Sequence, residues 1–395
     1  MSNKEFYISL IGNVDAGKST TIGSLTNPGL LDDGNGVLRK LVCKHPHERE
    51  SGRTSDISQR HIVYPDRVLN FIDLCGHEKY LRTTINGLSS INCDLAIVCI
   101  SDKITRMTKE HLGICLLTGI PILILFTKID LVPPQITNSL IRELKSVLPS
   151  KILFEIKKSQ DISFCIKTEN HIIPFIKTSN KSGNGMPFLS EFLQNIVKRH
   201  PKTTKNIFSI EHIYNITGYG TVLSGLLVGK SIKAGDTLYM GPFGRNREFI
   251  EVKVKTLHND YKNFIDKLEG GYRGCICIRY DRKYSKYIKK GMILTQNPSD
   301  IITCKKFKAK VKIFHHQTSI QPGYEAFANI GTVSENVKII SILNNENKNI
   351  EIVRNGDEAY IVFEFACNYH YIEPGQFIIF REGSTKGIGQ VTELL

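Results

Sequence analysis

One stretch of nine residues constrains the fold more than any other part of the chain. Residues 12–20 read Gly-Asn-Val-Asp-Ala-Gly-Lys-Ser-Thr, which matches the phosphate-loop pattern G-x-x-x-x-G-K-[ST]. An apolar, β-rich run precedes this stretch at residues 6–11, and a segment able to open a helix follows it. The sequence therefore predicts a strand, a phosphate-binding loop and a helix. The expected nucleotide-binding residues are Asn13, Val14, Asp15, Ala16, Gly17, Lys18, Ser19 and Thr20.

Two side chains of this loop have defined chemical roles in the pattern. The glycines let backbone N–H groups turn toward phosphate oxygens at the positive end of the helix. Lys18 is expected to reach the β- and γ-phosphates, and Ser19 is expected to ligate Mg²⁺.

The first two hundred residues alternate between strand and helix patterns. Apolar runs at 6–11, 68–72, 95–100, 122–126 and 173–177 predict buried parallel strands. Periodic segments at 105–118, 135–148 and 188–197 predict helices. Residues 27–62 and 150–170 lack clean periodicity and are expected to be irregular insertions, which are usually mobile or functional. The fold class is a doubly wound α/β domain with a mostly parallel sheet.

The rest of the chain has a different character. Short alternating runs separated by glycine-rich turns occur at 221–228, 237–240, 251–257 and 275–280, and a further run at 307–314 follows a break near residue 298. We therefore expect an α/β P-loop domain over 1–203 and two all-β barrel domains over 204–300 and 301–395.

Three further motifs follow predicted parallel strands and select the nucleotide. After the second strand, Asp73 can hold Mg²⁺ through water and the Gly76 N–H can meet the γ-phosphate. Thr127, Lys128 and Asp130 follow the strand at 122–126, where an Asp carboxylate can accept from two guanine donors that adenine lacks. Ser179 and Asn180 follow the strand at 173–177, where a backbone N–H can bind the guanine oxygen. Since strand ends of a doubly wound sheet meet at one crevice, these motifs predict a GTP site.

The charge of the chain favours a polyanionic partner. The formal net charge is +14, and a basic protein with no such partner is the alternative. The N-terminus lacks the apolar segment of a signal peptide, no apolar run approaches the length of a membrane span, and the ten cysteines are scattered. These features predict a cytoplasmic protein that does not bind membranes.

Two basic segments are candidates for RNA contact. Residues 306–312 have Lys at every second position, which fits a solvated strand face or a protected sheet edge as well as RNA. Residues 272–290 interleave basic and aromatic side chains, which suits phosphate contact and base stacking but also a solvated loop. The candidate RNA contacts are Arg279, Arg282, Lys283, Tyr284, Lys286 and Lys289.

With these motifs in place, the chain resembles the translational GTPases of the elongation factor Tu and elongation factor 1-alpha type. The likeness is greatest to the GTP-binding protein 1 and 2 subgroup, through residues 12–20, 73–81 and 375–383 and through Thr127, where most GTPases have Asn. Residues 218–225 and 232–238 resemble the signature of the second-domain barrel. The resemblance implies GTP/GDP and Mg²⁺ as ligands, Thr54 as a Mg²⁺ ligand in the GTP state, and His77 as the residue that orients the attacking water.

The resemblance also implies a partner and leaves two alternatives open. The implied function is a nucleotide switch that acts on the ribosome, aminoacyl-tRNA or another RNA, with hydrolysis stimulated by the partner. An exchange factor is a further partner consistent with the resemblance, and the expected state is a monomer. The alternatives are a GTPase subunit coupled to an enzyme such as sulfate adenylyltransferase, and a GTP-binding scaffold without turnover. The N-terminal extension of the subgroup is not expected, because the phosphate loop begins at residue 12. Thr127 is expected to orient the phosphate loop less well than Asn, because it can supply fewer hydrogen bonds. Richness in Ile, Lys and Asn is typical of an AT-rich genome, such as that of a large DNA virus.

Overall fold

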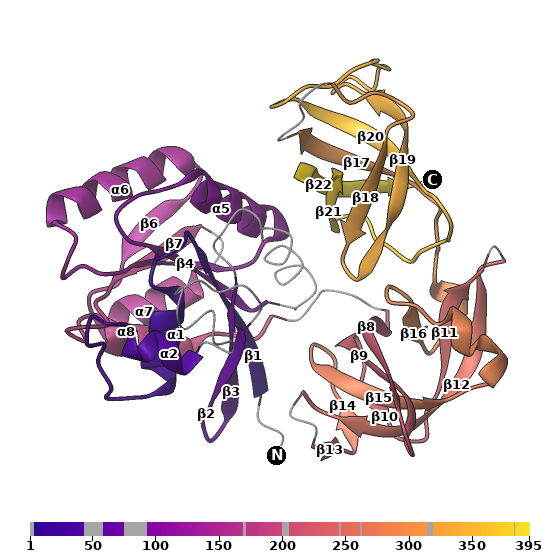
Figure 1. Cartoon of the computed structure of the whole chain (residues 1–395), viewed down its shortest axis with the longest axis horizontal. Helices are drawn as coiled ribbons and strands as arrows, with labels where there is room; N and C mark the ends of the chain where they lie inside the picture. Colours follow the sequence, from indigo (N-terminus) through magenta and orange to yellow (C-terminus); the bar gives the residue numbers. More distant parts are fainter. Residues whose placement is uncertain are drawn as a thin grey trace. The chain divides into compact units, whose positions relative to one another are not determined.

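The computed structural model divides the chain into two compact units, Met1–Arg199 and His200–Leu395 (Figure 1). The structure describes residues 4–42, 58–74, 93–168, 171–199, 205–244, 246–260, 263–313, 319–382 and 384–395. The described helices are all too short or too polar to cross a lipid bilayer. The three-domain division at 203/204 and 300/301 stays a prediction.

The first unit is built on a seven-stranded sheet. All neighbouring strands are parallel except β2, which pairs antiparallel with β3. In spatial order the strands are β2 (Ser58–Val63), β3 (Arg67–Asp73), β1 (Lys4–Gly12), β4 (Leu95–Ile100), β5 (Ile122–Phe126), β7 (Ile172–Lys177) and β6 (Ile152–Glu155). The predicted doubly wound, mostly parallel α/β fold is confirmed, and the predicted strands over 95–100 and 122–126 match β4 and β5 residue for residue.

Helices cover both faces of this sheet (Figure 1). On one face, side chains of α1, α7 and α8 pack with those of the central strands into one buried apolar cluster, while α5 and α6 lie on the other face (Figure 1). The described helices are α1 (Lys18–Thr26), α2 (Val37–Val42), α5 (Arg106–Thr118), α6 (Pro134–Val147), α7 (Ser159–Lys167) and α8 (Met186–Asn195). Helix α5 begins where the Thr105 hydroxyl accepts a hydrogen bond from the Thr108 N–H, and it ends at Gly119 with φ 62°.

The expectation that residues 150–170 form an irregular insertion is wrong. Strand β6 and helix α7 occupy this stretch. The strand has only four residues and lies at the sheet edge, so its apolar pattern is too short to stand out. Helix α7 begins after Lys158, and the Asp161 carboxylate accepts from the N–H groups of Lys157 and Lys158. In the stretch 27–62, α2 and β2 are also regular elements.

The second unit is antiparallel throughout its described strands. One sheet has the order β11 (Thr237–Phe243), β16 (Ile293–Thr295), β8 (Ile207–Ile216), β9 (Gly220–Val228), β15 (Arg273–Arg279), β12 (Glu248–His258) and β13 (Phe264–Ile265). An additional pairing of β11 with β12 joins the two ends of this sheet. The short strands β10 (Ile232–Lys233) and β14 (Lys267–Leu268) form a separate pair, and the 3₁₀ helices are η2 (Arg282–Tyr287) and η3 (Pro298–Asp300).

The remaining strands close into a six-stranded barrel. Their order is β17 (Lys306–Ile313), β20 (Glu358–Phe365), β19 (Val333–Leu343), β18 (Glu325–Ile330), β21 (Phe377–Glu382) and β22 (Ser384–Leu394). Their inward side chains form one apolar core that includes Phe307, Phe363 and Phe380. The predicted succession of a parallel α/β domain and antiparallel β domains is therefore confirmed.

The alternating lysines of β17 do not protect a sheet edge, because β17 pairs with both β20 and β22. Lys306 lies 3.7 Å from Glu364, and Lys310 and Lys312 lie 3.9 and 3.6 Å from Glu358. These pairs lie in solvent on one face of the barrel, so this segment is best interpreted as a solvated strand face.

Candidate nucleotide-binding site

The phosphate-loop residues connect the end of β1 at Gly12 with the start of α1 at Lys18. The backbone of this loop is left-handed at Asp15 (φ 59°) and at Gly17 (φ 80°). At Gly12 (φ 141°) an added Cβ would lie 2.3 Å from the Cys99 carbonyl oxygen, so only glycine fits beside β4. The loop thus has the tight, glycine-dependent path that phosphate loops require, at the N-terminus of a helix.

The side chain of Lys18 is buried, with 6% of its surface exposed. Its ammonium group donates to the carbonyl oxygens of Gly12, at 3.2 Å, and Asn13, at 2.7 Å. Within the described part of the chain, no carboxylate lies close enough to form an ion pair with it. A buried cation whose partners are neutral is costly, and an anion would relieve that cost. The position of Lys18 therefore suits binding of a phosphate.

Ser19 and Asp73 meet beside this lysine although they are far apart in sequence. The Ser19 hydroxyl donates to Asp73 Oδ2 at 2.5 Å, and both side chains are buried. Asp73 ends β3, and Ser19 lies in the first turn of α1. One hydroxyl and one carboxylate are hard oxygen ligands, which fits Mg²⁺.

Thr127 links the base-recognition motif to the phosphate loop. Its hydroxyl donates to the Ala16 carbonyl oxygen at 2.9 Å, and the side chain is almost fully buried. This bond ties the end of β5 directly to the loop, so the hydroxyl orients the loop despite being smaller than an amide. Lys128 follows with φ 57°, and Asp130 is exposed, so its carboxylate is accessible to a ligand.

The motif after β7 is tied to the helix that follows the phosphate loop. The Ser179 N–H donates to the Asn184 carbonyl within the same turn at 3.0 Å, so it is not available to a guanine oxygen. The Asn180 N–H is therefore the better candidate donor. Asn180 Nδ2 donates to the Thr21 hydroxyl of α1 at 3.2 Å, and the Asn180 carbonyl accepts from the Asp32 N–H at 3.0 Å.

The contacts of Thr21 and Asp32 were not expected from the sequence. The run Asp32-Asp33-Gly34-Asn35 has the composition of a turn, and the Asp33 carboxylate accepts from the Asn35 and Val37 N–H groups. Nothing in the pattern indicates that this turn meets the loop after β7. Thr54, Gly76 and His77 lie outside the described residues.

A histidine on α5 is a second feature that the sequence does not reveal. His111 is fully buried, and within the described part of the chain neither ring nitrogen has a hydrogen-bond partner. Burial lowers the pKa of His111 to about 3, and the charge of Lys18 acts in the same direction. His111 is therefore neutral at physiological pH.

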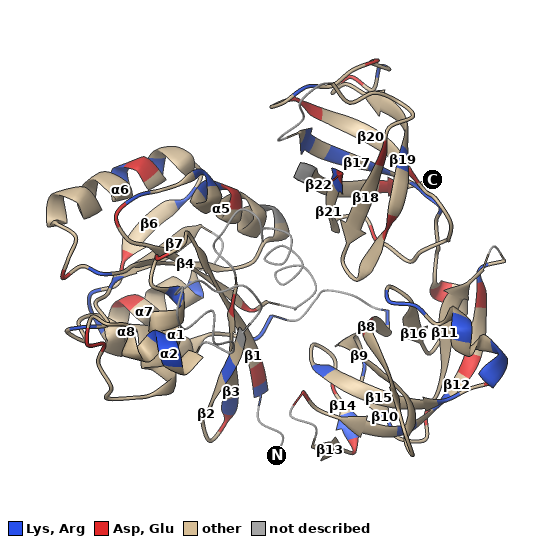
Figure 2. Cartoon of the chain, viewed as in Figure 1, with Lys and Arg blue, Asp and Glu red and all other residues tan. Residues whose placement is uncertain are grey.

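The basic segment after β15 lies in the second unit. Tyr284 is half-buried: its hydroxyl donates to Glu248 at 2.8 Å, its ring lies 5.4 Å from that of Phe243, and it is therefore engaged in packing. Lys283 pairs with Asp281 at 3.1 Å. Arg279, Arg282, Lys286 and Lys289 are exposed, as is the ring of Tyr287. Figure 2 shows that basic and acidic residues are scattered over the elements of both units.

Comparison with known proteins agrees with this geometry. The family model "Elongation factor Tu GTP binding domain" matches residues 3–202, and "Elongation factor Tu C-terminal domain" matches residues 300–395. The chain belongs to the elongation factor Tu family of translational GTPases.

Relatives match this chain over nearly its whole length. GTP-binding protein 1 of Xenopus laevis is 30% identical over 99% of the chain, which spans 64% of that protein. GTP-binding protein 2 of Homo sapiens is also 30% identical over 99% of the chain and 70% of that protein. Elongation factor 1-alpha of Thermococcus celer is 26% identical over 98% of the chain and 97% of that protein. The resemblance to this superfamily and subgroup is confirmed.

Solved structures share the fold of the chain. The selenocysteine-specific elongation factor EF-Sec of bacteria has a TM-score of 0.65 at 22% identity, covering 98% of this chain and 58% of that one. The Ski7 GTPase-like domain of S. cerevisiae bound to GTP has a TM-score of 0.68 at 15% identity, covering 99% and 97%.

Proposed function

We propose that this GTPase binds GTP with Mg²⁺ and hydrolyses it as a nucleotide switch in translation. The observation that carries the proposal is the buried Lys18, whose partners among the described residues are neutral and which lies next to the Ser19 and Asp73 oxygens. Such a site gains stability from a ligand that brings both negative charge and a cation. Membership of the elongation factor Tu family supports GTP as that ligand.

Each motif has a proposed role at the nucleotide. The N–H groups of residues 13–20 and the Lys18 ammonium group bind phosphate oxygens, while Thr127 and Lys128 hold the phosphate loop and base motif together. Asp130 accepts from the guanine base, and the Asn180 N–H donates to its oxygen. Ser19 and Asp73 would hold Mg²⁺, Asp73 through water, and the ion would supply positive charge at the phosphates.

Hydrolysis is assigned to three residues by family resemblance and position. His77 orients the attacking water, Thr54 joins the Mg²⁺ ligands in the GTP state, and the Gly76 N–H meets the γ-phosphate. Lys18 stabilises the charge that develops on the phosphate oxygens. Since catalysis by such sites is mostly positioning, we infer that turnover is slow until a partner aligns His77.

The proposed partner is the ribosome, or a tRNA or other RNA bound to it, and the proposed location is the cytoplasm. The net charge of +14 supports a polyanion, and the exposed Arg279, Arg282, Lys286 and Lys289 are proposed contacts. Lys283 and Tyr284 already have partners inside the second unit, so Tyr287 is the better stacking candidate. The function as a monomer and the need for an exchange factor are parts of the same proposal.

Measuring GTP hydrolysis by the full chain with and without ribosomes tests the function. We expect ribosomes to increase the rate at least about tenfold, and we expect His77→Ala to remove this increase while GTP affinity stays within about threefold. Stimulation by a sulfate adenylyltransferase in place of ribosomes would establish the coupled-enzyme alternative. GTP binding with no hydrolysis under any condition would establish the scaffold alternative. Wild-type stimulation of the His77→Ala variant would refute the role of His77.

A further inference from the structure

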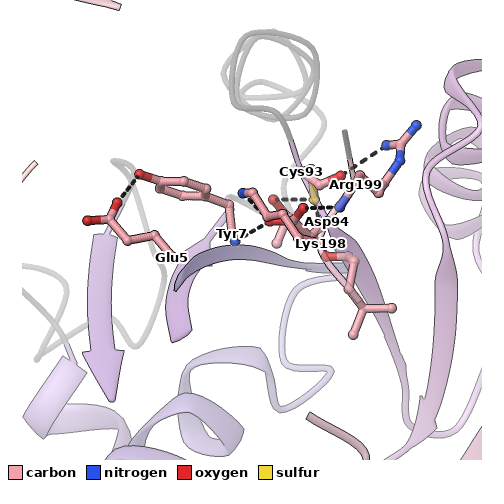
Figure 3. Close-up of polar contacts among 8 residues, drawn as sticks. Glu5, Tyr7, Cys93, Asp94, Lys198 and Arg199 are labelled. Atoms are coloured by element: carbon pink, nitrogen blue, oxygen red, sulfur yellow. Dashed lines mark hydrogen bonds and ion pairs between the residues drawn. The ribbon is translucent and has the colours of Figure 1, made fainter. Parts of the chain in front are cut away.

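A second buried lysine lies at the end of the parallel sheet where the strands begin, opposite the nucleotide end. Lys198 belongs to the last residues of the first unit, after α8, and Asp94 directly precedes β4. Figure 3 shows their side chains converging with Tyr7 of β1 and with Cys93 and Arg199. Three separate segments of the first unit therefore meet at one carboxylate: the middle of β1, the residue before β4 and the residues after α8.

Asp94 holds all three segments through its two carboxylate oxygens. Oδ2 accepts from the Tyr7 N–H at 2.8 Å and from the Lys198 ammonium group at 2.9 Å. Oδ1 accepts from the Arg199 N–H at 2.9 Å. Both charged side chains are inaccessible to water, with 4% of Lys198 and 0% of Asp94 exposed.

Other contacts hold the same exit segment, and most of them are polar. The Arg199 guanidinium donates to the Cys93 carbonyl oxygen at 3.0 Å, and that of Arg67 donates to the Ile196 carbonyl oxygen at 3.3 Å. The Lys198 ammonium group also lies 5.0 Å from the centre of the Tyr7 ring. Hydrogen bonds weaken steeply when their geometry changes, so these contacts favour one position of the exit segment. Apolar contacts are not directional and define that position less sharply.

A small cavity of about 40 Å³ lies on the other side of the exit segment. It is lined by Leu95, Phe192, Ile196 and Val197 together with Asp94. Val197, the neighbour of Lys198, has 58% of its surface exposed. The apolar contacts of Ile196 with the core and the polar contacts of Asp94 together hold the last residues of the unit.

Strand β1 connects this carboxylate to the phosphate loop. Tyr7 is bonded to Asp94 at both its N–H and its carbonyl oxygen, and β1 runs from there to Gly12, a distance of roughly 17 Å at the usual rise of a strand. Parallel strands β3 and β4 flank it on both sides. Because close-packed interiors are hardly compressible, a shift at one end of this central strand is transmitted to its other end.

We propose that Asp94 is a positioning residue that couples the nucleotide site to the point where the chain leaves the first unit. The Asp94–Lys198 pair holds the exit segment in register with β1, so the nucleotide state of the loop reaches the second unit through it. This inference rests on the proposed switch function. A buried ion pair adds little stability compared with apolar residues of the same size, and its best-attested use is to specify one arrangement.

Energy transfer between a donor dye at Ser146 and an acceptor dye at Glu346, both exposed, tests the coupling in the full chain. We expect the wild type to change its transfer efficiency between GDP and a non-hydrolysable GTP analogue. In Lys198→Met we expect less than about a third of this change, with GTP affinity within about threefold of wild type. Lys167→Met, the same substitution at an exposed site in the first unit, is the matched control and keeps the whole change.

A purely structural role for the pair would lower the melting temperature but leave the nucleotide-dependent change intact. If Lys198→Met does not fold, the neutral double variant Asp94→Asn/Lys198→Met replaces it, since that variant leaves no buried charge unpaired. A wild-type change in the folded variant overturns the inference. A wild-type protein that hydrolyses GTP on ribosomes but shows no change in transfer also overturns it while leaving the proposed function in place.

Discussion

Two buried lysines near opposite ends of β1 show how the protein separates binding from structure. Among the described residues, Lys18 donates to two backbone carbonyl oxygens, whereas Lys198 donates to the carboxylate of Asp94. Burial penalises both ammonium groups, and in the part of the chain that the structure describes Lys198 has a countercharge while Lys18 has none. The difference teaches that a buried cation with neutral partners marks a place for an external anion, and one with a carboxylate marks a fixed contact.

The largest effect is expected for Lys18→Ala. Loss of charged hydrogen bonds to the phosphates should weaken GTP binding by more than about 100-fold, while the melting temperature without nucleotide should not fall. Titration calorimetry and thermal unfolding measure both quantities, with the exposed Lys40→Ala as control. Binding that persists at wild-type strength would contradict the phosphate-loop assignment.

Asp94→Asn tests the second lysine of the comparison, Lys198, by removing the charge of its partner. Because it removes the carboxylate charge that faces the buried Lys198 ammonium group, it should lower the free energy of unfolding by about 3–5 kcal/mol, and GTP affinity of the folded protein should change by less than about threefold. Urea denaturation measures the loss, and the exposed Asp33→Asn is the control. An unchanged unfolding midpoint would show that the pair is not a fixed contact.

Thr127→Val tests a neutral partner of the phosphate loop. Valine keeps the shape of threonine but cannot donate to the Ala16 carbonyl oxygen, so GTP affinity should fall about tenfold. Fluorescent GDP displacement measures the change. Thr118→Val removes a hydroxyl that bonds only within α5 and should bind GTP as the wild type does. Equal GTP affinities of the two variants would show that the Thr127 hydroxyl does not orient the phosphate loop.

The smallest effect is expected where lysines are exposed rather than buried. Lys286→Ala/Lys289→Ala should weaken tRNA binding about threefold at low salt and reduce the salt dependence by about two counterions. The control is Lys310→Ala/Lys312→Ala, because both lysines face Glu358 on β17. Filter binding at several salt concentrations distinguishes them, and identical salt slopes for both pairs would exclude the segment after β15 as an RNA contact.

Sequence reasoning predicted the nucleotide end of the sheet better than the opposite end. Ser19 and Asp73 were expected to serve one metal because each follows or ends a strand with a recognisable pattern, and the structure brings them into contact. Asp94 and Lys198 have no such pattern, because a Lys after a helix is normally solvated. Their meeting depends on how far α8 extends, which periodicity gives only approximately.

Sequence patterns also fail for side chains that can serve either in packing or in ligand binding. The sequence makes Tyr284 a candidate for stacking on a base, with a solvated loop as the alternative, but its ring packs against Phe243 and its hydroxyl bonds to Glu248. Composition cannot separate an aromatic ring that packs from one that is presented to a ligand. The same applies to β6, whose four residues reveal their strand only through pairing with β7.

The contacts of Asn180 with α1 and with the turn at Asp32 have a consequence for how ligands compete. Asn180 bonds to Thr21 of α1 through its side-chain amide and to the Asp32 N–H through its carbonyl oxygen, so the loop after β7 is fixed against the helix that follows the phosphate loop. If the base and the phosphates bind at these two elements as proposed, they meet one preorganised receptor, and little ordering is needed when both halves bind together. Guanosine or pyrophosphate alone should therefore be a far poorer competitor than the joined molecule, because each fragment loses its translational freedom separately.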